Sequence, residues 1–246
     1  IFVGCNDDFG YLSNDKKGYM SYFSLSSDLS IVGQITKVVI CREEVYFYSE
    51  KKIFVYSVPE RVIKYILETT PGNEFTGILE HDNIIYVNES KTGLKRLEKY
   101  ALQKMDGGGV FKNKKIAVNI PFHHNQVLLC TSESECFTFN GEIFEPYQMQ
   151  IINYLKENRI VCGTAISDEL FALATFSGGC IIINKETGET IDIINYQSGL
   201  PDDEIFSIGT GNMGQLWISH YLGITRVDCS LPIRTFSTYP GLQGHL

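Results

Sequence analysis

The 246-residue sequence has few of the features that mark membrane or nucleic-acid-binding proteins. It contains a single Trp and 7 Pro. No apolar run approaches the roughly eighteen residues of a membrane-spanning helix. Basic residues are scarce, because 21 Lys and Arg stand against 29 Asp and Glu for a net charge of −8. This balance argues against binding to a phosphate backbone. We therefore expect a water-soluble globular chain with no nucleic-acid partner and no direct membrane contact.

Motifs for catalysis and metal binding are also missing. There is no serine elbow, kinase motif set, phosphate-binding loop or paired-His helix. His123 and His124 are adjacent in a predicted turn, and Gly107–Gly109 lacks the Lys that would follow in a phosphate-binding loop. We interpret the histidine pair as part of a turn and the glycine run as a flexible connection. The acidic group Asp202–Glu204 is interpreted as a loop before a strand. The sequence thus predicts no catalytic residue, no metal site and no cofactor.

The seven cysteines form no close zinc or redox motif, and their odd number leaves at least one unpaired. Most of them lie in predicted strands, where a free Cys acts as a small hydrophobic residue. Cys130 and Cys136 flank one tight loop and could face each other across a hairpin, so free thiols and a disulfide both stay open there. Cysteine usage by itself favours a reducing compartment.

What the sequence does contain is a repeat of short apolar strands with a period of about 40–45 residues. One strand in each unit usually has a large second residue. Those second residues stand at 2, 46, 86, 128, 172 and 217, with spacings of 44, 40, 42, 44 and 45. The runs are rich in Val, Ile, Tyr and Phe and are bounded by Gly, Asn, Asp and Ser, which is typical of strands. Several strands per repeat at this period predict a β-propeller.

Each unit is expected to form four antiparallel strands. An apolar first strand, such as Thr36–Cys41 or Ile205–Thr210, leads through a polar turn to the second strand, and a third follows a short loop. A turn such as Asn140-Gly141, a strong hairpin signal, opens a more polar fourth strand. The first two strands are nearly continuous apolar runs, which predicts cover on both faces. The fourth alternates, as in Ile233–Tyr239, which is typical of a wet outer edge.

The predicted fold is therefore all-β, with residues 1–246 forming one β-propeller domain of six blade units. The chain opens inside a strand at Ile1–Val3, and Gly241–Leu246 is similar to the entry to another unit. We therefore expect a fragment of a seven-bladed ring, truncated at both ends from a longer protein. Glu60–Thr70 has some helical character, but the repeat makes it an outer strand and loop. Trp217 is predicted to pack between blades, and Gly178-Gly179 to form a turn.

Several segments carry a likeness to a known family. Ser198–Ile208, followed by Gly214–Ile218 and Gly223–Asp228, resembles the two-component regulator propeller repeat. The opening Ile1–Leu12 and the later Leu173–Asn184 are similar to blades of one subgroup of that family. Members of that subgroup are membrane-spanning sensors. Their propellers precede a triple-tyrosine β-sandwich and a cytoplasmic output module, either a histidine kinase or a helix-turn-helix region.

The resemblance implies a seven-bladed ring, a periplasmic location and a sensory role linked to carbohydrate supply. The implied partners are an unidentified small-molecule or carbohydrate ligand, a downstream β-sandwich of the same chain, and a second copy through the full-length protein. No catalytic residue is carried over, and any kinase module would lie elsewhere in the full-length protein. The shared positions that the resemblance maps onto this chain are structural: Gly199, Leu200, Gly214, Leu216, Trp217, Gly223 and Asp228.

Together, the likeness and the missing motifs predict a ligand-sensing extracytoplasmic module without enzymatic activity of its own. Two other classes stay open. A propeller enzyme acting on glycans would gather carboxylates or His residues from different blades at the channel. The inward ends of the first strands are mostly Val, Ile, Ala and Ser, which counts against it. A protein-binding scaffold like the WD-repeat propellers would expose an aromatic or Arg cluster on one face.

Overall fold

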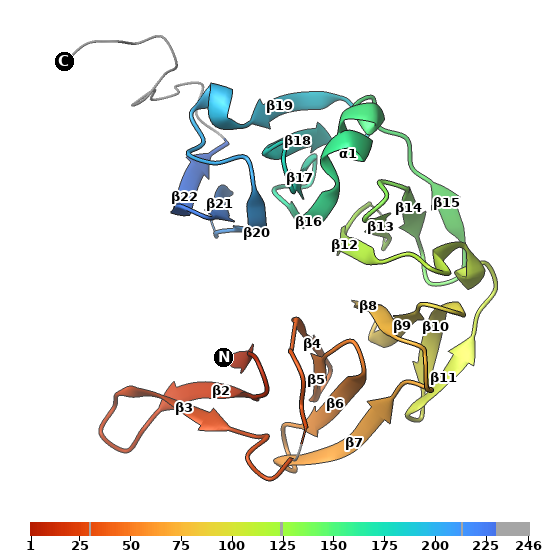
Figure 1. The fold of residues 1–246 in the computed structure, drawn as a ribbon, viewed down its shortest axis with the longest axis vertical. Coiled ribbons are helices and arrows are strands. Elements are labelled where there is room, and N and C mark those ends of the chain that lie inside the picture. Colours follow the sequence, from red (N-terminus) through yellow and green to blue (C-terminus); the bar gives the residue numbers. More distant parts are fainter. Residues whose placement is uncertain (30, 124, 213, 230–246) are drawn as a thin grey trace. The chain divides into compact units, whose positions relative to one another are not determined.

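The computed structural model describes residues 1–29, 31–123, 125–212 and 214–229, and these residues form six antiparallel sheets (Figure 1). Each sheet is a meander whose strands lie side by side in chain order. The sheets divide between two compact units, residues 1–115 and the residues from 116 onward, with three sheets in each. Each sheet corresponds to one predicted blade, which confirms the all-β propeller fold and its six blade units.

The first unit contains blades 1 to 3. Blade 1 has three described strands: β1 (Phe2–Gly4), β2 (Phe9–Asn14) and β3 (Met20–Ser24). Blade 2 consists of β4 (Lys37–Cys41), β5 (Glu44–Tyr48), β6 (Lys52–Ser57) and β7 (Val62–Glu68). Blade 3 consists of β8 (Phe75–His81), β9 (Ile84–Glu89), β10 (Gly93–Glu98) and β11 (Ala101–Lys104), followed by the 3₁₀ turn η1 (Gly108–Phe111).

The second unit contains blades 4 to 6. Blade 4 consists of β12 (Ile116–Pro121), β13 (Val127–Thr131), β14 (Cys136–Phe139) and β15 (Phe144–Pro146). The short helix α1 (Ile152–Asn158) leads to blade 5, with β16 (Ile160–Ala165), β17 (Leu170–Thr175), β18 (Cys180–Asn184) and β19 (Thr190–Ile194). After η2 (Tyr196–Ser198), blade 6 has the described strands β20 (Ile205–Thr210), β21 (Gln215–His220) and β22 (Gly223–Asp228).

The repeat predicted from the second strands matches the structure in every unit. The positions 2, 46, 86, 128, 172 and 217 lie on β1, β5, β9, β13, β17 and β21. The segment Glu60–Thr70 contains the outer strand β7, as the register of the repeat predicts. Ile233–Tyr239 and Gly241–Leu246 lie outside the described residues. The predictions of a single domain over residues 1–246 and of a seven-bladed ring stay predictions.

Hydrophobic cores lie between neighbouring blades within each unit. Successive side chains of a strand point to opposite faces of the sheet. On β5, Phe47 packs with Phe9 of blade 1, their ring centroids 4.3 Å apart. Its neighbours Tyr46 and Tyr48 share a core with Phe75 of blade 3. Blade 1 covers one face of β5 and blade 3 covers the other, so nearly every residue of this strand must be apolar.

One expectation about burial is wrong. The second strands β5, β13 and β17 are buried along almost their whole length, but among the described first strands only β8 is mostly buried. The first strands β4, β16 and β20 are partly exposed along much of their length. The edge position does not explain this, because β8 is also an edge strand and is mostly buried. Burial of a strand requires cover on both of its faces, which these three strands lack along part of their length. The apolar sequence of a first strand therefore does not imply full burial.

Two connections also differ from expectation. The Gly107–Gly109 segment is packed against blade 3 rather than flexible, because Gly108 begins η1 and is buried. A Cβ atom on Gly93 would lie 2.3 Å from the Gly108 oxygen, and one on Gly108 would lie 2.2 Å from the Leu94 oxygen. Only glycine permits backbones to approach so closely. The helix α1 was not predicted, since its seven residues are too few for a clear 3.6-residue pattern.

Candidate functional site

A cavity of about 540 Å³ lies between blades 2 and 3 of the first unit. The turn between β4 and β5, the turn between β8 and β9, and the strand β10 form its walls. Its size is within the usual range of small-molecule sites. Apolar side chains such as Ile85 and Leu97 form part of the lining. The charged and amide groups of the lining come from Arg42, Glu43, Glu44, Asn83, Arg96 and Glu98.

The two turns that line the cavity are tight hairpins. Cys41 pairs with Glu44 across one, and His81 pairs with Ile84 across the other, which leaves two residues in each loop. Both Asp82 and Asn83 have positive φ, at 50° and 59°. Asn and Asp tolerate this left-handed region better than most residues, and the type I′ hairpin requires it.

Glu44 is the most firmly held polar group of the cavity. The hydroxyls of Tyr46 and Tyr100 each donate a hydrogen bond of 2.7 Å to its carboxylate. The Lys64 ammonium lies 3.6 Å away, and the Tyr65 ring stacks on Tyr100 at 5.2 Å. Burial alone would raise the pKa of Glu44, but the two hydroxyls and Lys64 outweigh it and lower the pKa. The carboxylate is therefore a fixed negative charge.

The remaining charges are more accessible. The Arg96 Nε atom lies 3.1 Å from Glu98 Oε1, with both side chains about half exposed. Arg42 is exposed at the turn. Burial raises the pKa of the Cys41 thiol, with a further contribution from the Glu80 charge. This thiol is therefore protonated at neutral pH and a poor nucleophile. The lining thus combines hydrogen-bond donors and acceptors with apolar side chains.

The lowered pKa of Glu44 predicts an acid-dependent loss of stability. A carboxylate whose pKa falls on folding stabilises the protein above its ordinary pKa, here 4.5, and loses that contribution as the pH falls through the folded-state value. We expect Glu44→Gln to flatten the dependence of urea midpoint on pH below this value. Glu50→Gln, in the same blade, is the control. Parallel pH profiles for the wild type and Glu44→Gln would contradict the prediction.

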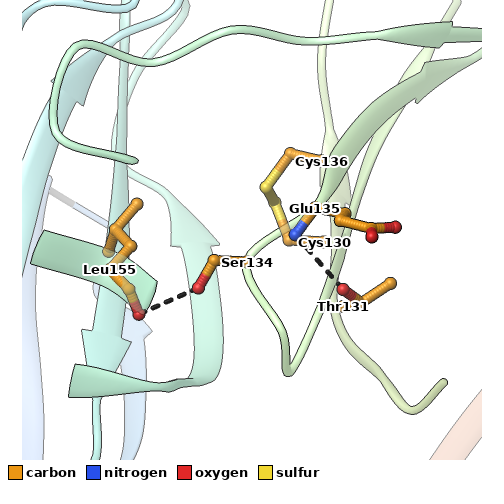
Figure 2. Close-up of a disulfide and its surroundings, with 6 residues drawn as sticks. All are labelled: Cys130, Thr131, Ser134, Glu135, Cys136 and Leu155. Atoms are coloured by element: carbon orange, nitrogen blue, oxygen red, sulfur yellow. Dashed lines mark hydrogen bonds between the residues drawn. A yellow bond between two sulfur atoms is a disulfide. The ribbon is translucent and has the colours of Figure 1, made fainter. Parts of the chain in front are cut away.

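In the second unit, Cys130 and Cys136 form a disulfide (Figure 2). The two residues are direct partners in the β13–β14 hairpin, and their Cα atoms are 4.1 Å apart. Of the alternatives that the sequence left open, the structure has the disulfide. Within the intervening loop, Ser134 is buried and its hydroxyl donates a 2.8 Å hydrogen bond to the Leu155 oxygen of α1. The disulfide hairpin is thus connected to the helix between blades 4 and 5.

The other five cysteines are free thiols. Cys5 is exposed and Cys41 lies at the cavity. Cys162, Cys180 and Cys229 belong to the core between blades 5 and 6. Burial raises the pKa of all three, so they act as small apolar side chains rather than as reactive thiolates.

Removing the disulfide should destabilise the protein. We expect Cys130→Ala/Cys136→Ala to lower the free energy of unfolding by about 2 kcal/mol, as the loss of a short covalent loop predicts. Chemical denaturation measures this change. Cys5→Ala is the control, with an expected effect within about 0.5 kcal/mol because Cys5 is exposed. Equal midpoints for the double variant and the wild type would show that the disulfide adds no stability.

The seven shared positions of the repeat resemblance all lie in the second unit, whereas the cavity lies in the first. Gly199, Gly214 and Gly223 have φ values of 104°, 77° and 129°, which glycine adopts readily. Leu200 and Leu216 are buried in the core between blades 5 and 6. The remaining two are Trp217, on β21, and Asp228, the last residue of β22.

Trp217 is 46% exposed among the described residues. It lies in blade 6, the last blade that the structure describes, so its packing between blades stays a prediction. The Arg226 guanidinium lies over its ring at 6.0 Å. On β21 the neighbours Leu216 and Ile218 face the core, so alternation points Trp217 to the other face of the sheet.

The other candidate motifs are placed mainly in turns. Gly178-Gly179 forms the turn between β17 and β18, where Gly179 has a φ of 75°. Asp202 and Asp203 accept hydrogen bonds from nearby backbone N–H groups in the loop before β20. His123 lies near Glu186, at 3.7 Å, and its neighbour His124 is outside the described residues. Within the described part of the chain, no cluster of His, Cys, Asp or Glu could hold a metal ion.

Sequence reasoning missed the cavity itself. Its residues come from separate hairpins, and the likeness is faint in this part of the chain. The turn pair Asp82-Asn83 between two apolar runs could have located one hairpin. None of the described helices has the length and apolar character that crossing a membrane would need.

Comparison with solved structures supports the fold. The WD40 β-propeller domain of Doa1 superposes with a TM-score of 0.68 at 13% identity, covering 92% of this chain and 73% of that chain. Virginiamycin B lyase from Staphylococcus aureus has a TM-score of 0.64 at 13% identity, and the match covers 92% of this chain and 78% of the lyase chain. PorZ from Porphyromonas gingivalis has a TM-score of 0.59 at 13% identity, and the match covers 91% of this chain and 37% of the PorZ chain. No family model matches the chain, and curated proteins give no significant match. At these identities the likeness shows the β-propeller fold alone.

Proposed function

We propose that this chain is a non-catalytic, ligand-sensing module of a membrane-spanning signal-transduction regulator of the two-component regulator propeller type. The repeat segments in blades 5 and 6 support the family, and the β-propeller fold is consistent with it. The observation that carries the proposal is the cavity between blades 2 and 3, with its fixed Glu44 carboxylate. Cavities of this kind, partly apolar with a few placed polar groups, are typical of small-molecule sites.

The proposed ligand is a carbohydrate. Arg42, Asn83, Glu43 and Glu98 provide donors and acceptors at the cavity, and such groups hydrogen-bond to sugar hydroxyls. Because Glu44 is already held by two tyrosines, it serves to fix the cavity wall. Binding that favours one of two arrangements of the regulator would shift their populations and transmit a signal.

The proposed location is the periplasm. The disulfide Cys130–Cys136 supports an oxidising compartment, because cytosolic proteins rarely keep such bonds. A thiol count on protein purified from its native compartment without reductant tests this. We expect five reactive thiols after denaturation, corresponding to the free cysteines, and seven after reduction. Seven thiols before reduction would contradict the proposed location.

Binding measurements test the ligand proposal. A panel of oligosaccharides is titrated into the wild type, Arg42→Ala and Arg96→Ala by calorimetry. We expect at least one ligand whose affinity falls about tenfold or more in both variants, which corresponds to about 1.4 kcal/mol. Arg61→Ala is the matched control, since Arg61 is an exposed arginine of blade 2 outside the cavity. Unchanged binding in the cavity variants would refute this site, and turnover of a glycan would refute the non-catalytic role.

A protein-binding scaffold is the second candidate, and one observation favours it. Trp217 is about half exposed and carries Arg226 over its ring, and these two residue types are enriched in interface hot spots. Proximity labelling in the native host would compare the wild type with Trp217→Ala and Arg226→Ala. A partner labelled by the wild type and lost in both variants would support the scaffold. Identical labelling in all three proteins would refute it.

A further inference from the structure

The outer strands of the blades differ in how they protect their free edge. Natural proteins prevent pairing at an edge strand with charges, proline, a bulge or a very short strand. The outer strand β7 carries Lys64 and Glu68, and its register with β6 is shifted. Strand β11 has four residues and ends at Lys104, and β15 has three and ends at Pro146. Strand β19 contains Asp192 and a register shift against β18.

Strand β3 has none of these protections. Its sequence, Met20–Ser24, has neither charge nor proline. It pairs with β2 over all five residues without a register shift. Its larger side chains are exposed, with Met20 at 61%, Tyr22 at 40% and Phe23 at 38%. An uncharged, regular edge of this kind is suited to pairing with another strand.

The direction of the backbone groups follows from the hydrogen bonds that flank this strand. The Leu25 N–H donates to the Phe9 oxygen at 2.8 Å, just beyond the last pair of β2 and β3. Along an antiparallel strand, alternate residues bond to the same neighbour. The backbone N–H and C=O groups that point away from β2 therefore belong to Met20, Tyr22 and Ser24.

We propose that β3 pairs with β3 of a second copy of this chain, antiparallel and with the two-fold axis at Tyr22. The strand is uncharged, so no like charges meet across the pair. Its two ends are complementary, because the turn before it carries Asp15, Lys16 and Lys17, a net charge of +1 from two basic and one acidic residue, and exposed Asp28 follows it. Antiparallel pairing brings the basic end of each copy to the acidic end of the other, whereas parallel pairing would bring lysines together.

This pairing would join two three-stranded blades into one continuous sheet. Contact through one short strand buries less than the roughly 1,200 Å² of stable interfaces. The dimer is therefore concentration-dependent. It uses only blade 1 and is independent of the ligand proposed for the cavity between blades 2 and 3.

Sedimentation equilibrium on the full chain tests the dimer. We expect reversible dimerisation in the wild type and Met20→Leu, and at least about a tenfold rise in Kd for Met20→Lys, because a charge would then lie at the edge. Val62→Lys is the matched control, since it adds the same charge to an exposed position of the protected strand β7. A wild type that stays monomeric, or a Kd unchanged by Met20→Lys, would overturn the proposal.

A cysteine placed on the two-fold axis provides a second test that does not depend on that variant. In a Cys5→Ser background, Tyr22→Cys would lie opposite itself, at a Cα separation of about 5.5 Å that a disulfide can span. We expect a disulfide-linked dimer on air oxidation. Val62→Cys, treated identically, should stay monomeric. Equal cross-linking of the two variants, or none in Tyr22→Cys with native circular dichroism, would show that β3 is not the interface.

Discussion

Replacing Lys95 with Met is expected to lower the free energy of unfolding by about 3–5 kcal/mol. Lys95 on β10 forms an ion pair with Glu89 at the end of β9, and the side chains are only 15% and 7% exposed. The Thr92 hydroxyl also donates to Glu89, at 2.8 Å. Without Lys95, the Glu89 carboxylate keeps its hydrogen bond from Thr92 but loses its positively charged partner, in a site that is largely shielded from water. Urea denaturation at neutral pH measures the change.

Two variants serve as controls for this prediction. Glu89→Gln/Lys95→Met removes both charges, and we expect it to recover much of the lost stability, because the neutral pair leaves no buried charge. Glu68→Ala removes a pair with Lys52 in which Glu68 is 61% exposed, and should cost less than about 1 kcal/mol. If Lys95→Met cost no more than Glu68→Ala, the buried pair would not matter for stability.

Phe171→Ala is expected to have a comparable effect in the second unit, a loss of about 3–5 kcal/mol. Phe171 on β17 is fully buried in the core between blades 4 and 5. Its ring contacts those of Phe122 and Tyr147 edge-on, at 6.3 and 6.2 Å. Truncation removes the buried apolar surface and leaves a cavity that a rigid sheet cannot refill. Guanidinium denaturation measures the shift.

The chain offers a matched control five residues away. Phe176 follows the same strand, and its side chain is 52% exposed. We expect Phe176→Ala to change stability by no more than about 0.5 kcal/mol. Similar losses for the two alanine variants would mean that burial between blades 4 and 5 does not account for the effect.

The sequence predicted the strands well, because strand signals are local. Apolar runs such as Val127–Thr131 are bounded by turn residues, and the run repeats in each unit at a regular interval. Burial was predicted less well. Apolar β4 is partly exposed whereas the first strand β8 is mostly buried, because burial depends on how neighbouring blades cover a strand rather than on its composition.

The disulfide shows where local information stops. Spacing placed Cys130 and Cys136 on either side of a loop, but only the register that makes them direct partners decides between a disulfide and two thiols. A shift of one residue would send the two side chains to opposite faces of the hairpin. The close packing of Gly108 against Leu94 was also not predictable from local sequence. It depends on the path by which the chain after β11 comes back to β10.

By itself, the sequence determined that the chain forms short antiparallel strands in a blade repeat, because a strand's side-chain alternation and its turns are encoded by adjacent residues. The tertiary structure alone decided where the cavity between blades 2 and 3 forms. Tyr100 donates its hydrogen bond to Glu44 across 56 residues of sequence, and Asn83 comes to the same cavity from another hairpin. Such contacts depend on the packing of one blade against the next, which no local pattern records.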